Sequence, residues 1–363
     1  MSRPKTADKT CSIASPLTLC CLFSLAGCGG VPSEETPTAA PTGSITVIEQ
    51  KEVASKETGQ LSIVIERLEE IAERSIVDKG ADTLLTVQKV VSPGSAFSSY
   101  DVGKDDRIVA SVFNQEGRNG SDIWVFSGGK TRISNSNYFN DFPSFSADSK
   151  RIYFSSTRNT ATGGLYDQNC YIWRMVASGA GGITRIGTPV FAYAGAQESP
   201  DGQRLLFDAR EFYENSSFVW YSTANGNLPT MLTQGRDARW MDDEKIIFST
   251  VDENSGLEAI WTLNIVGSEL TQIISDPELD CLSPEASPNG KHIAYVKQKP
   301  GDENRSTRDI FVHTIETGLS QQITTNISRD DMPQWSETGD ALFFRSTRGV
   351  TWNIWKVSMA FLE

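Results

Sequence analysis

Histidine is almost absent from this chain of 363 residues, since only His292 and His313 occur. A metal site built from three histidines of one chain is therefore excluded, and histidine-dependent catalysis has two candidates at most. Each of the two follows a turn or a strand end in the sequence pattern, so we expect surface or edge positions for both. We predict no metal ion and no cofactor.

Basic residues are also scarce. Lys and Arg total 33 against 46 Asp and Glu, which gives a formal net charge of −13. A nucleic-acid-binding protein needs a basic surface, so we expect no nucleic-acid partner. Hydrophobic residues make up 38% of the chain, a proportion typical of globular proteins. The mean hydropathy of −0.31 excludes a polytopic membrane protein.

The apolar stretch near the N-terminus is short. It covers residues 16–26, whereas a membrane-spanning helix needs about 20 apolar residues. Arg3, Lys5 and Lys9 precede it, and a positive start before a short apolar stretch is typical of an export signal. We therefore predict a signal peptide over residues 1–27.

The Leu-Ala-Gly-Cys run at 25–28 resembles the lipobox of bacterial lipoproteins, where small residues admit the peptidase and the cysteine carries the lipid. The resemblance implies a lipid anchor at Cys28 and a location in the bacterial cell envelope. Gly29 follows, with no Asp in that place, and by resemblance to the sorting rules of enteric lipoproteins this implies the outer membrane facing the periplasm. The alternative is an ordinary signal peptide in which Cys28 is incidental.

Two further segments precede the main body of the chain. Residues 28–45 are rich in Pro and Thr and cannot bury enough apolar surface to fold, so we expect a tether. Residues 46–82 contain apolar positions at helical spacing, which predicts a short helix packed on the folded body or bound to a partner. Cys170 and Cys281 lie far apart in the pattern described next, and we expect them to be unpaired.

From about residue 92 onward the chain repeats. A strand, a polar turn and a second strand recur six times, and each is followed by a strand centred on an aromatic residue. Each unit holds about four short strands, and a period of 40–50 residues is typical of β-propeller blades. We therefore predict an all-β, six-bladed β-propeller of four-stranded blades over residues 83–363. The recurring aromatics, expected to pack between blades, are Trp124, Trp173, Trp220, Trp261, Phe311 and Trp355.

The Ser-Pro-Asp-Gly-Gln run at 199–203, the Ser-Pro-Asn-Gly-Lys run at 287–291 and the Ile-Trp strands resemble the WD40-like PD40 repeats of TolB-like propellers. The resemblance covers about residues 86–363. These motifs are fairly specific for the fold and weakly specific for function. TolB carries an α/β domain before its propeller, for which this chain has too few residues, and TolB is not lipidated. The resemblance therefore implies a TolB-like lipoprotein.

Blade six lacks a closing outer strand after residue 358. The run at 86–93 matches the missing strand, so we predict that it completes blade six and leaves no open sheet edge.

Polar residues recur at one position of the predicted innermost strands. They form a candidate channel ring for a small polar ligand or ion, and the alternative is solvated channel lining. The ring consists of Ser144, Gln197, Arg239, Glu285 and Gln334.

A two-residue hairpin turn in blades two and six would place Asp141 opposite Arg158 and Asp331 opposite Arg348. We expect these pairs at the channel mouth, where the inner strands begin. Their recurrence favours a structural role, and the alternative is that the arginines present charge to an anionic partner.

A serine hydrolase needs Ser, His and Asp together, and in prolyl oligopeptidases with a similar propeller the hydrolase is a separate domain. Oligogalacturonate lyases share the propeller type but need several metal-binding histidines. We therefore expect a non-enzymatic cell-envelope lipoprotein whose propeller docks a protein or envelope polymer at its mouth. The alternative is a propeller enzyme or sugar-binding protein with a polar site in the central channel.

Overall fold

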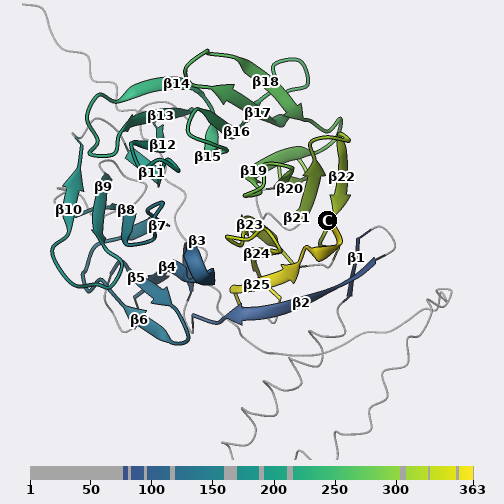
Figure 1. Cartoon of the computed structure of the whole chain (residues 1–363). Coiled ribbons are helices and arrows are strands. Elements are labelled where there is room, and N and C mark those ends of the chain that lie inside the picture. Colours follow the sequence, from purple (N-terminus) through teal and green to yellow (C-terminus); the bar gives the residue numbers. More distant parts are fainter. Residues whose placement is uncertain are drawn as a thin grey trace, which may run out of the picture. The chain divides into compact units, whose positions relative to one another are not determined.

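The structure is a computed structural model that describes residues 77–80, 83–93, 96–114, 119–158, 170–187, 192–210, 216–302, 308–325, 328–348 and 351–362. The predicted signal peptide, Cys28, the tether and the predicted helix before residue 77 lie outside these residues. Within them, six antiparallel sheets surround a central channel (Figure 1). The predicted all-β six-bladed propeller is therefore confirmed.

Each blade runs outward from the channel in chain order (Figure 1). Blade one holds β3 (Phe97–Val102), β4 (Ile108–Phe113), β5 (Ser121–Phe126) and β6 (Lys130–Arg132), with the 3₁₀ turn η2 (Lys104–Asp106). Blade two holds β7 (Asn140–Phe145), β8 (Arg151–Ser156), β9 (Tyr171–Val176) and β10 (Thr184–Ile186). Blade three holds β11 (Ala192–Glu198), β12 (Arg204–Arg210), β13 (Ser217–Thr223) and β14 (Thr230–Gln234).

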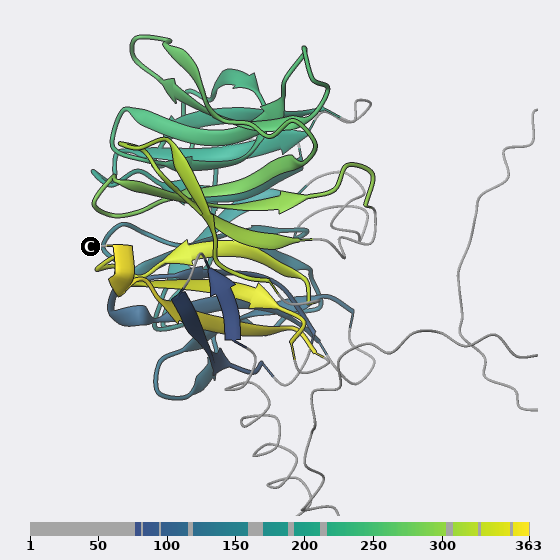
Figure 2. The same ribbon diagram turned by 90° about the vertical axis from the view of Figure 1, so that its right-hand side faces the viewer.

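The second half of the ring repeats this order. Blade four holds β15 (Arg236–Trp240), β16 (Lys245–Val251), β17 (Glu258–Asn264) and β18 (Leu270–Ile274). Blade five holds β19 (Asp280–Ala286), β20 (His292–Gln298), β21 (Asp309–Thr314) and β22 (Leu319–Gln322). Blade six holds β23 (Asp330–Trp335), β24 (Ala341–Ser346) and β25 (Asn353–Ser358), followed by η3 (Ala360–Leu362). From the side, the strands run between the two faces of the ring (Figure 2).

The repeated turn motif shapes the inner hairpins through its own side chains. In blade three, the Ser199 hydroxyl donates to Asp201 at 2.5 Å and accepts the Arg204 amide at 2.9 Å. Gly202 has a φ of 71°, a conformation that glycine adopts without steric cost. The motif therefore makes a four-residue turn between β11 and β12.

The inner strands also share a β-bulge. In blades two to six, one inner-strand residue has a positive φ, and the bulge shifts the register toward the second strand. As a result, counting residues outward from the hairpin turn gives the wrong partners for the inner-strand residues that precede the bulge. The bulge residues are Phe142, Gly195, Asp237, Ser283 and Met332.

Six hydrophobic clusters hold the ring together, one at each junction between neighbouring blades. Trp355, for example, is fully buried between blades six and five, in one cluster with Leu282 and Val296. Each of the recurring aromatics lies in or against one of these clusters, which confirms their expected packing role. Burial of this surface is the main stabilising contribution to the ring.

An N-terminal strand closes the ring as predicted. β2 (Thr83–Val91) pairs with β25, and Val87 lies opposite Val357 with only 2% of its surface exposed. The strand begins earlier than predicted. β1 (Val77–Gly80) pairs with it as a fifth strand, so the predicted helical segment 46–82 is wrong at residues 77–80, which form a strand.

The two histidines are not at the surface, so that prediction was wrong. His292 and His313 are only 7% and 6% exposed. The His292 ring packs against Trp335, and the His313 ring contacts the Ser320 hydroxyl at 3.0 Å. Burial lowers the pKa of both rings. Cys170 and Cys281 are buried in blades two and five, and no disulfide joins them. None of the helices in the described ranges is long and apolar enough to cross a membrane.

Candidate functional site in the central channel

The five residues of the predicted channel ring all line cavities in the channel. The structure adds Asp101 of β3, which occupies in blade one the place of Ser144 in blade two. Sequence reasoning missed Asp101 because the hairpin of blade one lacks the Ser-x-Asp-Gly turn. The signal that could have found it is Gly103, which begins the turn and whose amide donates to the Arg107 carbonyl at 2.8 Å.

Charged side chains of blades one and four line the same cavity of the channel. The Arg239 guanidinium donates to the Glu285 carboxylate at 3.1 Å, joining blades four and five. Asp101 and Asp208 also stabilise the Arg239 charge, and the Asp208 carboxylate accepts the Asp237 amide at 2.7 Å. Acidic groups therefore outnumber the single arginine at this place.

The carboxyl groups of the channel hold their protons more tightly than carboxyls in water. Burial raises the pKa of Asp101 to about 6 and of Glu285 to about 7, although the Arg239 charge opposes both shifts. Asp208, which does not line the described cavities but contacts the bulge of β15, has its pKa raised to about 7 by burial and by the Asp237 charge. The negative charge of the channel therefore increases as the pH rises from 5 to 8.

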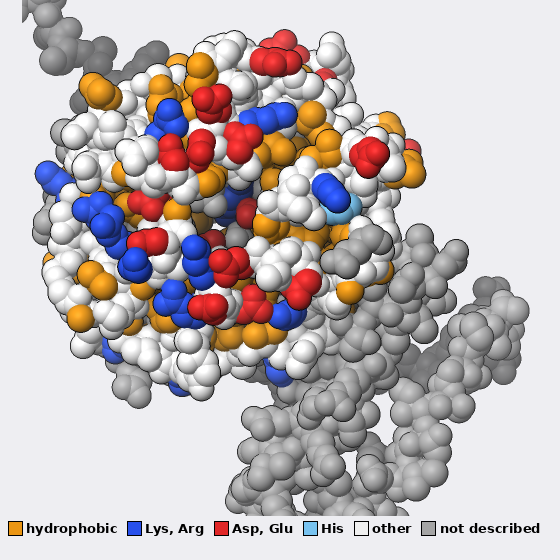
Figure 3. All heavy atoms as spheres, in the orientation of Figure 1, with side chains coloured by type: hydrophobic (Ala, Val, Ile, Leu, Met, Phe, Trp, Pro, Cys, Tyr) orange, Lys and Arg blue, Asp and Glu red, His pale blue; other side chains and the backbone are white. Residues whose placement is uncertain are grey.

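A hollow of about 440 Å³ opens where the inner strands end, at the hairpin turns. The space-filling view shows this face, with acidic and basic side chains around a central depression (Figure 3). Aromatic and proline side chains share the wall with carboxylates. The lining includes Asp101, Lys104, Phe145, Glu198, Pro200, Trp240, Glu285, Pro288, Trp335 and Glu337.

The hollow lies at the opposite end of the channel from the mouth that the sequence predicted. Toward that end, the bulge residues Phe142 and Met332 line smaller cavities of about 30 and 50 Å³. Such cavities hold a few water molecules at most. Among the described residues, no three His, Cys, Asp or Glu side chains come together in a way that could hold a metal ion.

The predicted pairs of Asp141 with Arg158 and of Asp331 with Arg348 are wrong. The hairpin turns have four residues instead of two, and the bulge removes one more residue from the ladder. As a result, Asp141 lies opposite Ser155 and Asp331 lies opposite Arg345.

The aspartates instead join neighbouring blades. The Asp141 carboxylate is buried and accepts hydrogen bonds from Ser98 at 2.6 Å and from Ser99, both of blade one. Asp331 accepts from Arg345 at 2.7 and 2.8 Å and from Arg308 of blade five at 3.2 Å. These contacts support a structural role for both aspartates.

The two arginines have different surroundings. Arg348 is 3% exposed and donates to Asp330, the residue before the predicted partner, at 2.8 Å. Arg158 is half-buried, with its guanidinium carbon 5.4 Å from the Tyr138 ring centre and 5.5 Å from that of Trp173.

Comparisons with known proteins identify the fold. No protein-family model matches the sequence, and no curated protein matches it. Among solved structures, TolB from Acinetobacter baumannii matches with 17% identity and a TM-score of 0.54, over 70% of this chain and 64% of that one. A puromycin hydrolase matches with 11% identity and a TM-score of 0.50, over 74% of this chain and 45% of that one. An oligogalacturonate lyase in complex with manganese matches with 11% identity and a TM-score of 0.49, over 78% of this chain and 95% of that one.

The chain thus spans less than two thirds of the Acinetobacter baumannii TolB. At these identities a likeness concerns the fold and not the activity. The described part of the chain is a TolB-like six-bladed β-propeller.

Proposed function

We propose that this protein is a non-enzymatic lipoprotein of the bacterial cell envelope whose propeller is a docking scaffold for a partner protein or envelope polymer. The observation that carries the proposal is the open hollow at the hairpin turns. Its volume and its mixture of aromatic, proline and charged walls suit a chain segment that enters from outside. The proposed envelope location rests on the sequence of residues 1–28.

Charge indicates the kind of segment. Asp101, Glu198, Glu285 and Glu337 face the hollow, whereas Lys104 is the basic residue of its lining. Complementary charge selects partners and accelerates their association. We therefore infer that the docked segment is basic.

A channel enzyme or sugar-binding protein is the second candidate. The raised pKa values of Asp101 and Glu285 favour it, since a carboxyl that titrates near neutral pH can serve as an acid or base. Both groups are already engaged, however: Glu285 pairs with Arg239, and Asp101 accepts the Phe145 amide at 2.8 Å. These contacts favour binding over catalysis.

The docking proposal predicts that reversing one charge at the hollow weakens partner capture. Glu337 is exposed at its rim, and E337K in the lipidated protein should reduce crosslinked partner recovered from membranes by about tenfold. Recovery by the wild type should increase from pH 5 to pH 8, as Asp101 and Glu285 lose their protons. The control is E269K, at an exposed position before the outer strand β18. Equal recovery with both variants would contradict docking at this hollow.

Lipidation predicts a change in location. Replacing Cys28 by serine removes the thiol that would carry the acyl chains, and stable anchoring needs more than one chain. We expect the C28S protein to leave the membrane fraction, as measured by immunoblotting of fractionated cells. C281S, which changes a buried thiol of the propeller, is the control. If C28S stays firmly in the membrane fraction, the anchor lies elsewhere.

A further inference from the structure

Blades two and six share a local sequence that the other blades lack. Their second strands run into Ser-Thr-Arg at 156–158 and 346–348. The backbone turns in the same way in both, because the Arg158 amide donates to Ser156 at 3.2 Å and the Arg348 amide to Ser346 at 3.1 Å. The two arginines therefore occupy equivalent places.

In blade six this place is filled by an internal ion pair. The Arg348 guanidinium donates to the Asp330 carboxylate at 2.8 Å, and both residues are buried. The guanidinium carbon also lies 5.2 Å from the Phe344 ring centre and 5.9 Å from that of Trp355. Blade six thus shows that a carboxylate is the natural partner of an arginine in this setting.

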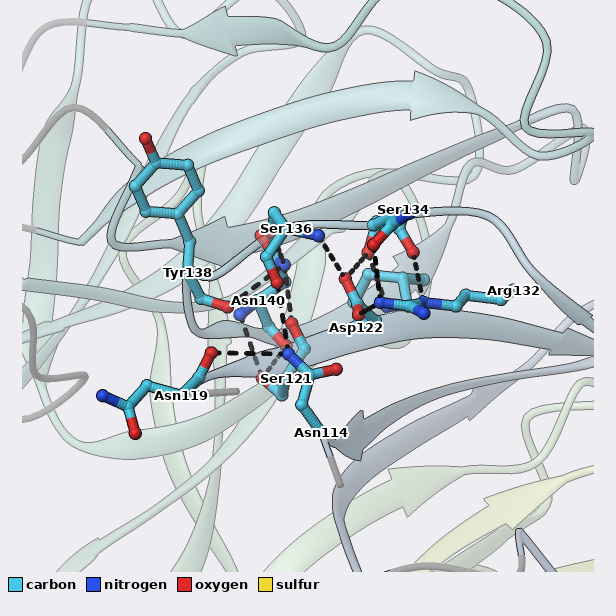
Figure 4. Close-up of polar contacts among 11 residues, drawn as sticks. Asn114, Asn119, Ser121, Asp122, Arg132, Ser134, Ser136, Tyr138 and Asn140 are labelled. Atoms are coloured by element: carbon cyan, nitrogen blue, oxygen red, sulfur yellow. Dashed lines mark hydrogen bonds and ion pairs between the residues drawn. The ribbon is translucent and has the colours of Figure 1, made fainter. Parts of the chain in front are cut away.

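In blade two an amide stands where blade six has the carboxylate. Asn140 is the first residue of its inner strand, as Asp330 is in blade six. The Asn140 amide nitrogen donates to the Ser121 carbonyl at 2.7 Å and to the Ser136 hydroxyl at 3.0 Å, as Figure 4 shows. Its oxygen accepts from Ser156 at 2.8 Å. Asn140 is held by these bonds and carries no charge to neutralise Arg158.

Arg158 consequently has no carboxylate partner among the described residues. Its Nε atom is buried without a hydrogen bond, and so is the indole nitrogen of Trp173 beneath it. Asp122 lies in the same region but is engaged by Arg132 and by the Ser134 hydroxyl at 2.8 Å (Figure 4). A buried, unpaired cationic donor is costly, so its presence requires an explanation.

Aromatic rings hold the guanidinium in place. Tyr138 and Trp173 contact it through cation–π interactions, and the Tyr138 ring turns away from the polar network of Asn140 (Figure 4). Because a stacked guanidinium keeps its planar fork fixed, little ordering is needed when a carboxylate binds. Arg158 is also more exposed than Arg348, so an external group can reach it.

We propose that Arg158, held by Tyr138 and Trp173, is a binding site for a carboxylate supplied from outside the chain, such as an acidic side chain of a peptide. The external carboxylate takes the role that Asp330 has in blade six. The site follows the end of β8, which begins at the hairpin turn, so it lies at the opposite face from the hollow. It is therefore independent of docking at the hollow.

The test measures the dissociation constant of tetraglutamate for the full chain by calorimetry at low salt, with tetraglutamine as the uncharged probe. We expect the wild type to bind tetraglutamate and not tetraglutamine. N140D should weaken binding at least tenfold, because it restores the internal carboxylate while Arg158 remains. R158Q should do the same, and R185Q, which changes an exposed arginine stacked on Tyr171, should bind like the wild type.

N140D and R158Q test the site independently, so the test still gives an answer if one of them fails to fold. Circular dichroism shows whether each variant is folded. Wild-type affinity in folded N140D and R158Q would overturn the proposal, as would equal binding of tetraglutamine. Displacement of tetraglutamate by an equal concentration of inorganic phosphate would overturn the assignment to carboxylates.

Discussion

Replacing Asp331 by asparagine is expected to lower the free energy of unfolding by about 3–5 kcal/mol, the usual cost of removing one partner from a buried ion pair. The variant removes the negative charge and one of the two acceptor oxygens that face Arg345, so the buried guanidinium loses its counter-charge and one of its two hydrogen bonds. The Arg345 guanidinium also donates to the Ser98 carbonyl and stacks 4.3 Å from the Trp352 ring centre, so it cannot swing freely into water. The expected decrease in the free energy of unfolding should therefore not be offset by rearrangement of Arg345.

Urea unfolding followed by circular dichroism measures this effect. E269Q, at an exposed position without an ion pair in the described part of the chain, should leave stability unchanged. Exposed ion pairs contribute up to about 1 kcal/mol. If D331N lowered the free energy of unfolding by less than this, the ion pair of Asp331 with Arg345 would not be the buried network described above.

The same carboxylate gives the fold an acid dependence. Burial acts against the Asp331 charge, but Arg345 and Arg308 outweigh it and hold the pKa of Asp331 below its usual value. A depressed pKa stabilises the fold above the unfolded value of about 4, and this contribution is lost as the pH falls through the folded value. D331N should therefore lose less stability on acidification than the wild type.

Removing the closing strand is the second change with a large expected effect. A chain that begins at residue 92 lacks β1 and β2, whereas one that begins at residue 77 keeps both. The shorter chain loses the burial of Val87 and Val91 and should be less stable by about 3–6 kcal/mol, at about 1.5–3 kcal/mol for each buried side chain. It also leaves β25 as an open edge that favours aggregation.

Thermal unfolding of the two chains, with light scattering to detect association, measures this difference. V90T in the longer chain is the control, because Val90 of the same strand is 42% exposed. Equal stability of the two chains would mean that the ring closes without β2.

Much of the fold could be predicted from the sequence because its signals are local. The recurring aromatic at Trp124, Trp173 and the equivalent positions marks one position in every blade that packs against a cluster between blades, so the spacing of these aromatics gives the number of blades. The match of residues 86–93 to an outer strand predicted the closure by the same logic. The ring of Ser144, Gln197 and their equivalents followed from alternation along the inner strands, where successive side chains face opposite sides.

Features that depend on the exact register or on contacts between blades became known only from the three-dimensional structure. A bulge at Met332 alters the register by an amount that no pattern within the hairpin reveals, and this pairs Asp331 with Arg345 instead of Arg348. The hairpin turn of blade one lacks the repeated motif. Asp101 belongs to the channel ring because the inner strand of blade one faces the same cavity as the inner strands of the other blades. The number of blades, their order and the closing strand could be derived from the sequence alone, because they follow from local periodicity. Which charges meet, and at which end the channel opens, followed only from the packing of the blades around one axis.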